Sequence, residues 1–239
     1  MSNDICKCTV VPEVNITNTM RYVFDQLKSP IAIRDLSSRL VYCNQPLALL
    51  ADKRSPNEII GKFDSEFDCA ILDTEESIEN FAKQYKRIFE TQTPFSTLEL
   101  HPHAVDFPFI FHKIPYFNDK HECIGMLGYN TQLTVYTLND YVKGHMPGSL
   151  LLNKPDDTFT ERECEVMFYR LQGLKSKEAA ARLNLSLNTF NNYMQKIYNK
   201  VHVTEIGELR DFCEKHNYHR YLPKRFLTHE AINFSDSII

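Results

Sequence analysis

Apolar residues along the first 135 positions follow two different periods, one typical of helices and one typical of strands. They recur every three or four positions over residues 16–27 and 78–89, which predicts two amphipathic helices. Short β-branched and aromatic runs predict strands at residues 30–34, 40–43, 95–102, 107–116 and 123–129. Strands and helices in this order predict an α+β domain in which an antiparallel sheet carries its flanking helices on one face.

Residues 159–203 carry the signals of three short helices joined by tight turns. Thr160 and Glu163 form a capping box that starts the first helix. Ser176 is expected to cap the second helix and Ser186 the third. Helix, short turn and helix is the geometry that places the second of two helices in the DNA major groove, so this part is predicted to be an all-α DNA-binding domain.

The third of these helices has two chemically distinct faces. One face is apolar and must pack on the preceding helices: Phe190, Met194, Ile197 and Val201. The other face is polar: Asn191, Asn192, Gln195, Lys196, Asn199 and Lys200. Asn and Gln can hydrogen-bond bidentately to adenine, and Lys can approach guanine or phosphate, so this face suits DNA. The alternative is an ordinary solvated face, because outer helix faces are usually polar.

The segment 138–158 contains two glycines and two prolines without a regular period, and it is interpreted as a linker. We therefore expect a flexible N-terminus (1–14), an α+β domain (15–136), a linker (137–157) and a DNA-binding domain (158–239). The chain as a whole is slightly acidic, with a net charge of −4. Residues 170–200, in contrast, hold six basic side chains against Glu178 alone, which indicates a polyanionic partner.

Composition excludes several classes of protein. With 24% charged residues and no apolar run near the ~18 that cross a bilayer, no membrane span is expected. The N-terminus has no basic start followed by an apolar core, so the protein is expected to be cytoplasmic. The seven scattered cysteines are expected to be free thiols, and they do not form a zinc motif. Because the chain has no nucleophile elbow, phosphate-binding loop or acid/base pair, we do not expect an enzyme.

The C-terminal part resembles the LuxR-type helix-turn-helix family. The matching positions are Phe159-Thr160, Arg162-Glu163, Glu165-Val166, Gly173, Lys177-Glu178, Ala180, Leu183, Leu185-Ser186, Thr189-Phe190, Ile197, Lys200 and Val203. The family usually has a basic residue at Asn191 and a histidine at Tyr193, so the recognised base sequence stays open. The helix expected after Thr204, over residues 205–216, is used for dimerisation in that family; packing on its own domain is the alternative.

The resemblance to the LuxR type implies a role for individual residues of the helix-turn-helix. It implies base-edge contacts from Asn191, Asn192 and Gln195. It implies phosphate contacts, which position the helix without reading sequence, from Lys175, Ser176, Lys177, Thr189, Lys196 and Asn199. The partners expected in this way are double-stranded DNA and a second copy of the chain, because two reading heads match two half-sites.

The N-terminal part resembles a PAS sensor domain over about residues 15–135. The resemblance rests on the order of elements, on Asn44 after the second strand, on residues 61–64 (GKFD) after the short helices, and on the hairpin at Asn118. It implies a ligand between the sheet and its helices. The reactive-cysteine motif of flavin-binding members is absent, and residues 75–92 hold no histidine for haem, so neither cofactor is expected.

Phe107, Phe109, Phe111 and Lys113 alternate along one expected strand and should share a face. If that face is interior, Lys113 needs an acceptor, and a ligand carbonyl or carboxylate would serve. The simpler expectation is that Pro108 shifts the register or that Lys113 extends to solvent. Three histidines nearby, at positions 101, 103 and 112, are expected to lie on the surface, so no metal is expected.

The pairing of both domains, with the stretches LVYCNQ, IIGKFD, LELHP and FHKIP, is similar to quorum-sensing regulators that bind a small pyrazine. That resemblance implies Tyr42, Phe111 and Lys113 as pocket residues. The run Ile33 to Asp35, followed by Cys43-Asn44, is also similar to TraJ-like conjugation activators, for which no ligand is established. We therefore predict a homodimeric transcription regulator with a small-molecule ligand. The alternatives are a ligand-independent activator, or a protein-interaction module with a degenerate helix-turn-helix.

Overall fold

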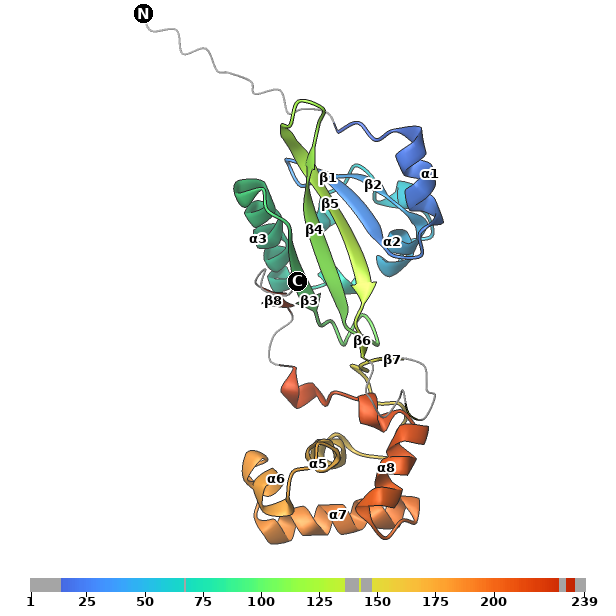
Figure 1. Ribbon diagram of the computed structural model, residues 1–239, viewed down its shortest axis with the longest axis vertical. Coiled ribbons are helices and arrows are strands. Elements are labelled where there is room, and N and C mark those ends of the chain that lie inside the picture. The colour runs from blue at the N-terminus through green and yellow to red at the C-terminus, as the bar shows by residue number, and fades with distance from the viewer. Residues whose placement is uncertain (1–13, 67, 136–141, 143–147, 228–230, 235–239) are drawn as a thin grey trace, which may run out of the picture. The chain divides into compact units, whose positions relative to one another are not determined.

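The computed structural model describes residues 14–66, 68–135, 142, 148–227 and 231–234. The chain divides into two compact units (Figure 1). The first comprises Met1–Leu98, Ile110–Thr131 and Ile232–Ile239, and the second comprises Glu99–Phe109 and Gln132–Ala231. The domain limits expected from the sequence stay predictions. The division into compact units differs from them at two places. The loop 99–109 groups with the second unit, and the described C-terminal residues 232–234 group with the first.

A six-stranded sheet organises the sensor part, in the order β2-β1-β5-β4-β3-β8. Its strands are β1 (Ile31–Asp35), β2 (Leu40–Cys43), β3 (Phe95–Glu99), β4 (Phe109–Phe117), β5 (Cys123–Gln132) and β8 (Ala231–Phe234). Strand β1 pairs antiparallel with both β2 and β5. The α+β class predicted from the sequence is confirmed, whereas edge strand β8 was not predicted.

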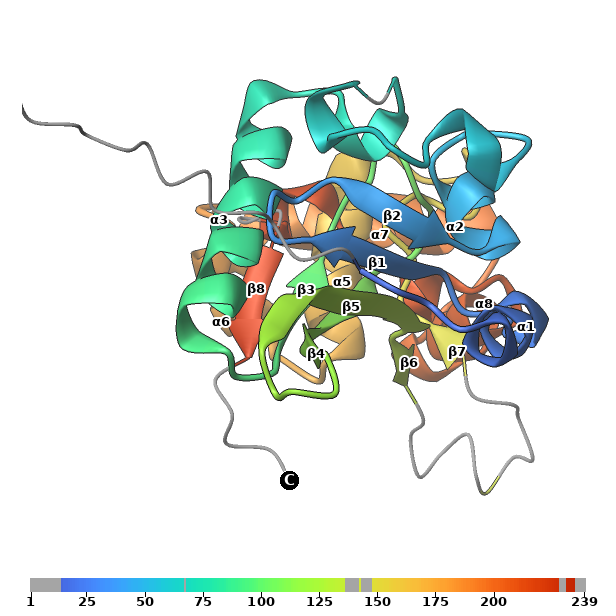
Figure 2. The same ribbon diagram turned by 90° about the horizontal axis from the view of Figure 1, so that it is seen from above.

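Helices lie on both faces of this sheet, so the expected one-sided arrangement is wrong (Figures 1 and 2). The helices are α1 (Asn18–Gln26), α2 (Gln45–Leu50) and α3 (Glu75–Thr91), with 3-10 turns at Pro56–Glu58, Asp64–Glu66 and Ala70–Leu72. On one face Ile31, Ile33 and Tyr42 form a core cluster that Phe24 of α1 joins. On the other face Phe111 of β4 meets Phe81 of α3, with ring centroids 6.1 Å apart. We call this second face, covered by α3, the sensor interior.

Asn44 fixes the geometry at the end of β2, as its position in the sequence predicts. Its side-chain oxygen accepts hydrogen bonds from the backbone N–H of Leu47, which caps α2, and of Ile31 at 2.9 Å. Its amide nitrogen donates to the backbone carbonyls of Phe24 and Ser29. One buried side chain thus ties α1, β1 and α2 together.

The second unit is built mainly of helices. They are α5 (Glu161–Leu171), α6 (Ser176–Arg182), α7 (Leu187–Val201) and α8 (Ile206–Lys215), with 3-10 turns at Tyr218–Arg220 and Lys224–Phe226. Thr160 and Glu163 form the predicted capping box, and Ser186 caps α7 by accepting from the Thr189 N–H. The predicted cap at Ser176 is wrong, because α6 begins at that residue and its N-cap is Lys175.

A short antiparallel ribbon stands between the sheet and these helices in the sequence, where a linker was expected. It pairs β6 (Thr134–Val135) with β7 (Gly148–Ser149). Two residues after β7, Leu151 forms a parallel bridge with Tyr221. No helix in the described ranges is both long enough and apolar enough to cross a membrane.

Candidate DNA-binding surface and sensor interior

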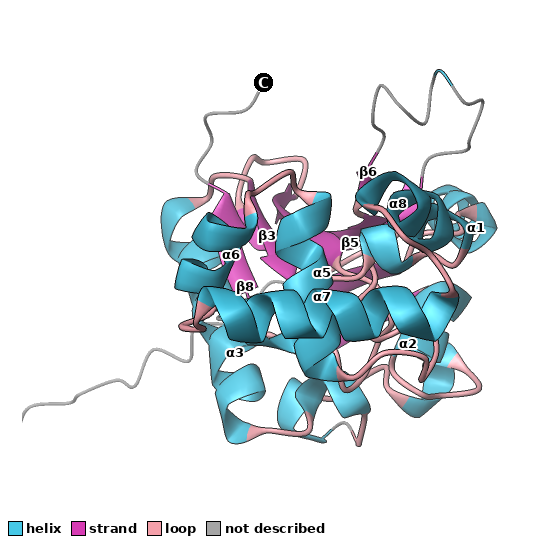
Figure 3. Cartoon of the chain, turned by 90° about the horizontal axis from the view of Figure 1, so that it is seen from below, coloured by secondary structure: helices cyan, strands magenta, loops and turns pink. Residues whose placement is uncertain are grey.

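Helix α7 separates its apolar and polar residues as the sequence predicts. Phe190 and Ile197 are fully buried and Met194 is 6% exposed, within a core that α5, α6 and α8 share. Arg162 of α5 donates to the backbone carbonyl of Leu183 at 3.0 Å, which fixes the end of α6 against α5. In Figure 3 α7 lies across the neighbouring helices as one straight element. Its outer face is therefore held on a rigid support.

The polar side chains predicted to contact DNA are exposed, apart from Ser176, which is half-buried. The exposed ones are Lys175, Lys177, Thr189, Asn191, Asn192, Gln195, Lys196 and Asn199. Helix α7 contains no acidic residue, so its outer face offers amides and ammonium groups without a competing carboxylate of its own. Gln195 donates to the Oδ1 of Asn199 at 3.0 Å, which orders two of these amides along the helix. We call these exposed side chains of α7, together with Lys175 and Lys177 at the start of α6, the α7 surface.

Lys200 does not belong to the α7 surface, although helical spacing placed it there. Its Nζ donates to the carboxylate of Glu163 at 2.7 Å and to the backbone carbonyl of Thr158 at 3.1 Å. Burial alone would raise the pKa of Glu163, but the bonds from Lys200 and Thr160 hold this pKa below its ordinary value. Lys200 therefore anchors the C-terminal end of α7 to the start of α5.

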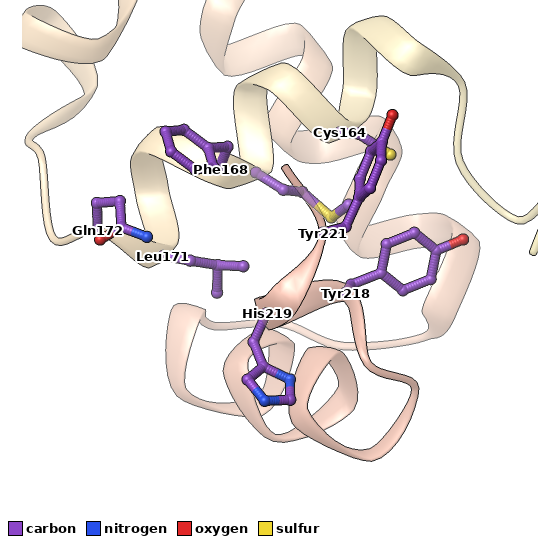
Figure 4. Close-up of a pocket in the computed structure, with 8 residues that line it drawn as sticks. Cys164, Phe168, Leu171, Gln172, Tyr218, His219 and Tyr221 are labelled. Carbon is purple, nitrogen blue, oxygen red and sulfur yellow. The ribbon is translucent and has the colours of Figure 1, made fainter. Parts of the chain in front are cut away.

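Helix α8 directs its apolar side chains into its own domain. Leu209 and Cys213 are fully buried, and Ile206 and Phe212 pack against the same core. Burial raises the pKa of the Cys213 thiol to about 12, which keeps this thiol neutral. Within this core lies a small hollow, of about 10 Å³, beside the turn after α8 (Figure 4). Its lining residues are Cys164, Met167, Phe168, Leu171, Gln172, Tyr218, His219 and Tyr221. A hollow of that volume holds about one water molecule, so it does not suit an organic ligand.

In the sensor interior, Phe111 and Lys113 lie together on the inner side of β4. Phe111 is 8% exposed and Lys113 is completely buried. The expectation that Lys113 extends to solvent, or that Pro108 shifts the register, is wrong. Strand β4 begins at Phe109, after the proline, so its alternation is intact and only Phe107 falls outside it, 40% exposed.

The Lys113 ammonium lies in a polar chain that sequence reasoning did not find. Its Nζ donates to Thr97 of β3 at 2.8 Å, and the Thr97 hydroxyl donates in turn to Gln84 of α3 at 3.4 Å. The same Nζ lies 3.8 Å from the centroid of the Phe111 ring, within cation–π distance. Alternation along β3 indicates that Thr97 faces inward. Its contacts with Lys113 and Gln84 on other elements cannot be inferred from a single sequence.

A second buried network in the sensor interior joins Arg34 of β1 to Asp64 and Tyr85. Arg34 forms a salt bridge with Asp64, and Tyr85 donates to the other carboxylate oxygen of Asp64 at 2.8 Å. The Arg34 guanidinium also lies 4.7 Å from the centroid of the Tyr85 ring. Burial lowers the pKa of Arg34, but its interactions with Tyr85 and Asp64 raise it overall, so the guanidinium stays charged. These groups give the interior fixed polar walls.

Tyr42 is not brought together with Phe111 and Lys113. It lies on the α1 side of the sheet, where its hydroxyl donates to Asp25 at 2.7 Å and its ring packs on Phe24. Burial and the bond to Asp25 raise the pKa of Tyr42. The three predicted pocket residues therefore divide between the two faces of the sheet.

Of the three histidines expected on the surface, only His103 is exposed, whereas His101 is buried and His112 is half-buried. His101 is 1% exposed and bonds to the carboxylate of Glu99 at 3.3 Å. His112 bridges Ser96 and Thr131 through its two ring nitrogens, and burial with the nearby Lys113 charge lowers its pKa. Among the residues that the structure describes, no group of three or more His, Cys, Asp or Glu side chains could hold a metal ion.

Comparison with protein families identifies both parts of the chain. Residues 157–212 match the bacterial regulatory proteins of the luxR family, and residues 24–135 match the PAS fold. The two family resemblances predicted from the sequence are thereby confirmed. The chain combines a PAS-fold domain with a LuxR-type helix-turn-helix domain, which is the composition of a bacterial transcription regulator.

Among solved structures, the chain is similar to VqmA over nearly its full length. The VqmA–ligand–DNA complex from Vibrio cholerae shares 22% identity with a TM-score of 0.65, covering 94% of this chain and 99% of that one. The phage VqmA–DPO complex shares 24% identity with a TM-score of 0.61, covering 91% of this chain and 95% of that one. At these identities the likeness establishes a shared fold. A comparison with curated protein sequences found no significant match.

Proposed function

We propose that this protein is a cytoplasmic transcription regulator that binds double-stranded DNA through the α7 surface. The observation that carries the proposal is the division of α7 into a buried apolar stripe and an exposed face without acids. We assign base contacts to Asn191, Asn192 and Gln195. Backbone contacts are assigned to Lys175, Ser176, Lys177, Thr189, Lys196 and Asn199. The DNA present in the related VqmA complex supports this assignment.

The DNA-binding proposal is tested with duplexes enriched from a random-sequence pool by the full-length protein. Gln195→Ala should weaken binding to the enriched duplex by about 1–3 kcal/mol and relax its preference at one position. Gln26→Ala is a matched control, because Gln26 is an exposed glutamine on α1, outside the α7 surface. If the enriched duplex binds Gln195→Ala and the wild type equally, Gln195 does not read bases.

We further propose that the sensor interior binds a small, flat heterocycle with at least one hydrogen-bond acceptor. Phe111 offers a ring face, and the buried Lys113 ammonium offers a donor, whose charge-assisted hydrogen bond is strong where water is excluded. Support comes from VqmA, whose related structure contains the small molecule DPO. We assign Tyr42 to support of the sheet from the α1 side rather than to direct ligand contact.

Thermal unfolding in the presence of a set of nitrogen heterocycles tests the ligand proposal. A compound that binds the native state at about 100 times its Kd stabilises the protein by about 2.7 kcal/mol. We expect Lys113→Met to remove that shift and Tyr42→Phe to retain it. A set without any stabilising compound would favour the ligand-independent mode of action.

A homodimer is part of the proposal, because regulators of this type place two reading heads on neighbouring half-sites. The apolar side chains of α8 are buried in the core of its own domain, so we expect the dimer interface to involve other elements. Sedimentation velocity of the full-length protein should give twice the mass of the chain. A monomer at micromolar concentration, free and on DNA, would contradict this part of the proposal.

A further inference from the structure

The loop between β3 and β4 is held by the linker through two adjacent residues of the second unit. The backbone N–H of Leu152 donates to the carbonyl of Asp106 at 2.8 Å. The side-chain amide of Asn153 donates both to the carbonyl of Pro102 and to the carboxylate of Asp106, each at 3.0 Å. An asparagine amide has two N–H groups, so one side chain can hold the loop at two points. We call this arrangement the Asn153 clamp.

The same short segment is tied on its other side to the end of the helix-turn-helix domain. Leu151 donates its backbone N–H to the carbonyl of Arg220, and Leu222 donates to the carbonyl of Leu151, both at 2.9 Å. Next to them, Tyr221 donates to Glu161 at the start of α5 at 2.7 Å. Helix α5 also holds α7 through Glu163. Hydrogen bonds therefore connect the Asn153 clamp with the support of the α7 surface.

At its other end the clamped loop continues into strands that line the sensor interior. Thr97 lies on β3 and Lys113 on β4, and the two are hydrogen-bonded to each other. The loop between these strands is internally braced. The carbonyl of His101 accepts from the N–H groups of two later loop residues, and its ring stacks on Phe109. A braced loop moves as a unit, so a shift of either strand reaches the clamp through the chain itself.

We propose that Asn153 is a positioning residue that makes the DNA-binding domain respond to the state of the sensor interior. The inference rests on the proposed function and adds its route of regulation. A change at Thr97 or Lys113 moves the β3–β4 loop, and the Asn153 clamp transfers that movement to segment 151–153 and from there to α5. Coupling of this kind needs a physical element that both sites bias, and the clamped loop is such an element.

Three variants separate the clamp from general stability. Asn153→Asp keeps the shape but removes both donors and places a carboxylate against Asp106. Asp106→Asn keeps an acceptor for Asn153 and should be nearly neutral. In the double variant the amide introduced at position 106 can donate to the carboxylate introduced at position 153, so one clamp bond is restored with reversed polarity. Asp157→Asn, at a fully exposed position of the same segment, controls for the change of charge.

The first readout is hydrogen exchange of the full-length protein and needs neither DNA nor ligand. Lys113→Met should speed exchange at residues 150–153 by about tenfold in an otherwise wild-type chain, because these amides lose local protection. With Asn153→Asp the added effect of Lys113→Met should vanish, and in the double variant it should return. Thr97→Val replaces Lys113→Met if the latter does not fold. Unchanged exchange at residues 150–153 on changing Lys113 or Thr97 would overturn the proposal.

The second readout is affinity for the enriched duplex. Lys113→Met should change this affinity by about fivefold, a coupling energy in the usual range, and the change should disappear with Asn153→Asp. An equal change with and without the clamp would overturn the inference while leaving DNA binding intact. If the wild type enriches no duplex at all, DNA binding fails as a function, and hydrogen exchange alone decides whether the clamp transmits.

Discussion

Two lysines one turn apart on α7 should respond to substitution in opposite ways. Lys200 bonds to Glu163 and Thr158, whereas Lys196 is exposed, with its Nζ 5.9 Å from the centroid of the Tyr193 ring. Lys200→Met should therefore lower the free energy of unfolding and leave direct DNA contacts in place. Lys196→Met should leave stability unchanged and remove a phosphate contact.

The cost of Lys200→Met follows from its partners. A hydrogen bond to a charged group contributes about 1.5–3 kcal/mol when buried. Lys200 is 38% exposed, and solvent screening reduces the contribution of such a pair. The Glu163 oxygen also keeps the bond from the Thr160 N–H at 2.8 Å, so its carboxylate is not left bare. We expect Lys200→Met to cost about 1–2 kcal/mol, and Lys196→Met less than about 0.5 kcal/mol.

Urea unfolding followed by far-ultraviolet circular dichroism measures the change in the free energy of unfolding, since the chain has no tryptophan for fluorescence. The salt dependence of affinity for the enriched duplex measures the loss of a phosphate contact. Lys196→Met should reduce the slope of log affinity against log salt by about one unit, and Lys200→Met should not change it. The assignment is refuted if Lys200→Met is as stable as the wild type and loses a unit of slope, because Lys200 would then contact phosphate.

Three further substitutions test other parts of the structure. The pKa of Glu163 lies below its ordinary value of 4.5, so its carboxylate stabilises the fold above that pH and loses this effect as the pH falls through the lowered pKa; Glu163→Gln should flatten the acid limb of a thermal-unfolding pH series, and an unaltered limb would contradict the assignment. Asn44→Ala should cost about 3 kcal/mol in urea unfolding, because it orphans several backbone groups around a buried position; a cost below about 1 kcal/mol would mean that water replaces these bonds. Gly128→Ala would place a Cβ 2.5 Å from the Phe111 ring, so we expect a loss of about 1–3 kcal/mol and a weaker ligand-induced thermal shift, and a neutral effect would show that the interior has spare room.

Local features of the fold could be predicted from the sequence because their causes are local. The capping box at Thr160, the cap at Ser186 and the buried stripe of α7 each depend on residues a few positions apart. The inward alternation of Phe111 and Lys113 follows from strand geometry in the same way. A pattern of this kind states which residues share a face, and the structure confirms those pairings.

Features that depend on distant partners could not be predicted in this way. Helical spacing placed Lys200 on the outer face, but its long side chain bends back to Glu163, 37 positions earlier. The family resemblance placed Tyr42 in the pocket with Phe111 and Lys113, but only the structure shows that its face of β2 meets α1. Strand β8 is four residues long and has no periodic signal, so only its partner in the sheet identifies it.

Strand β8 has a practical meaning for handling the protein. A strand at the margin of a sheet shields the backbone donors and acceptors of its neighbour, here β3. Removing the chain from Ala231 onward would leave the backbone edge of β3 unpaired, so that a strand of another molecule could pair with it. Purification tags are therefore better fused ahead of Met1, and C-terminally shortened material should be checked for aggregation before its regulatory behaviour is interpreted.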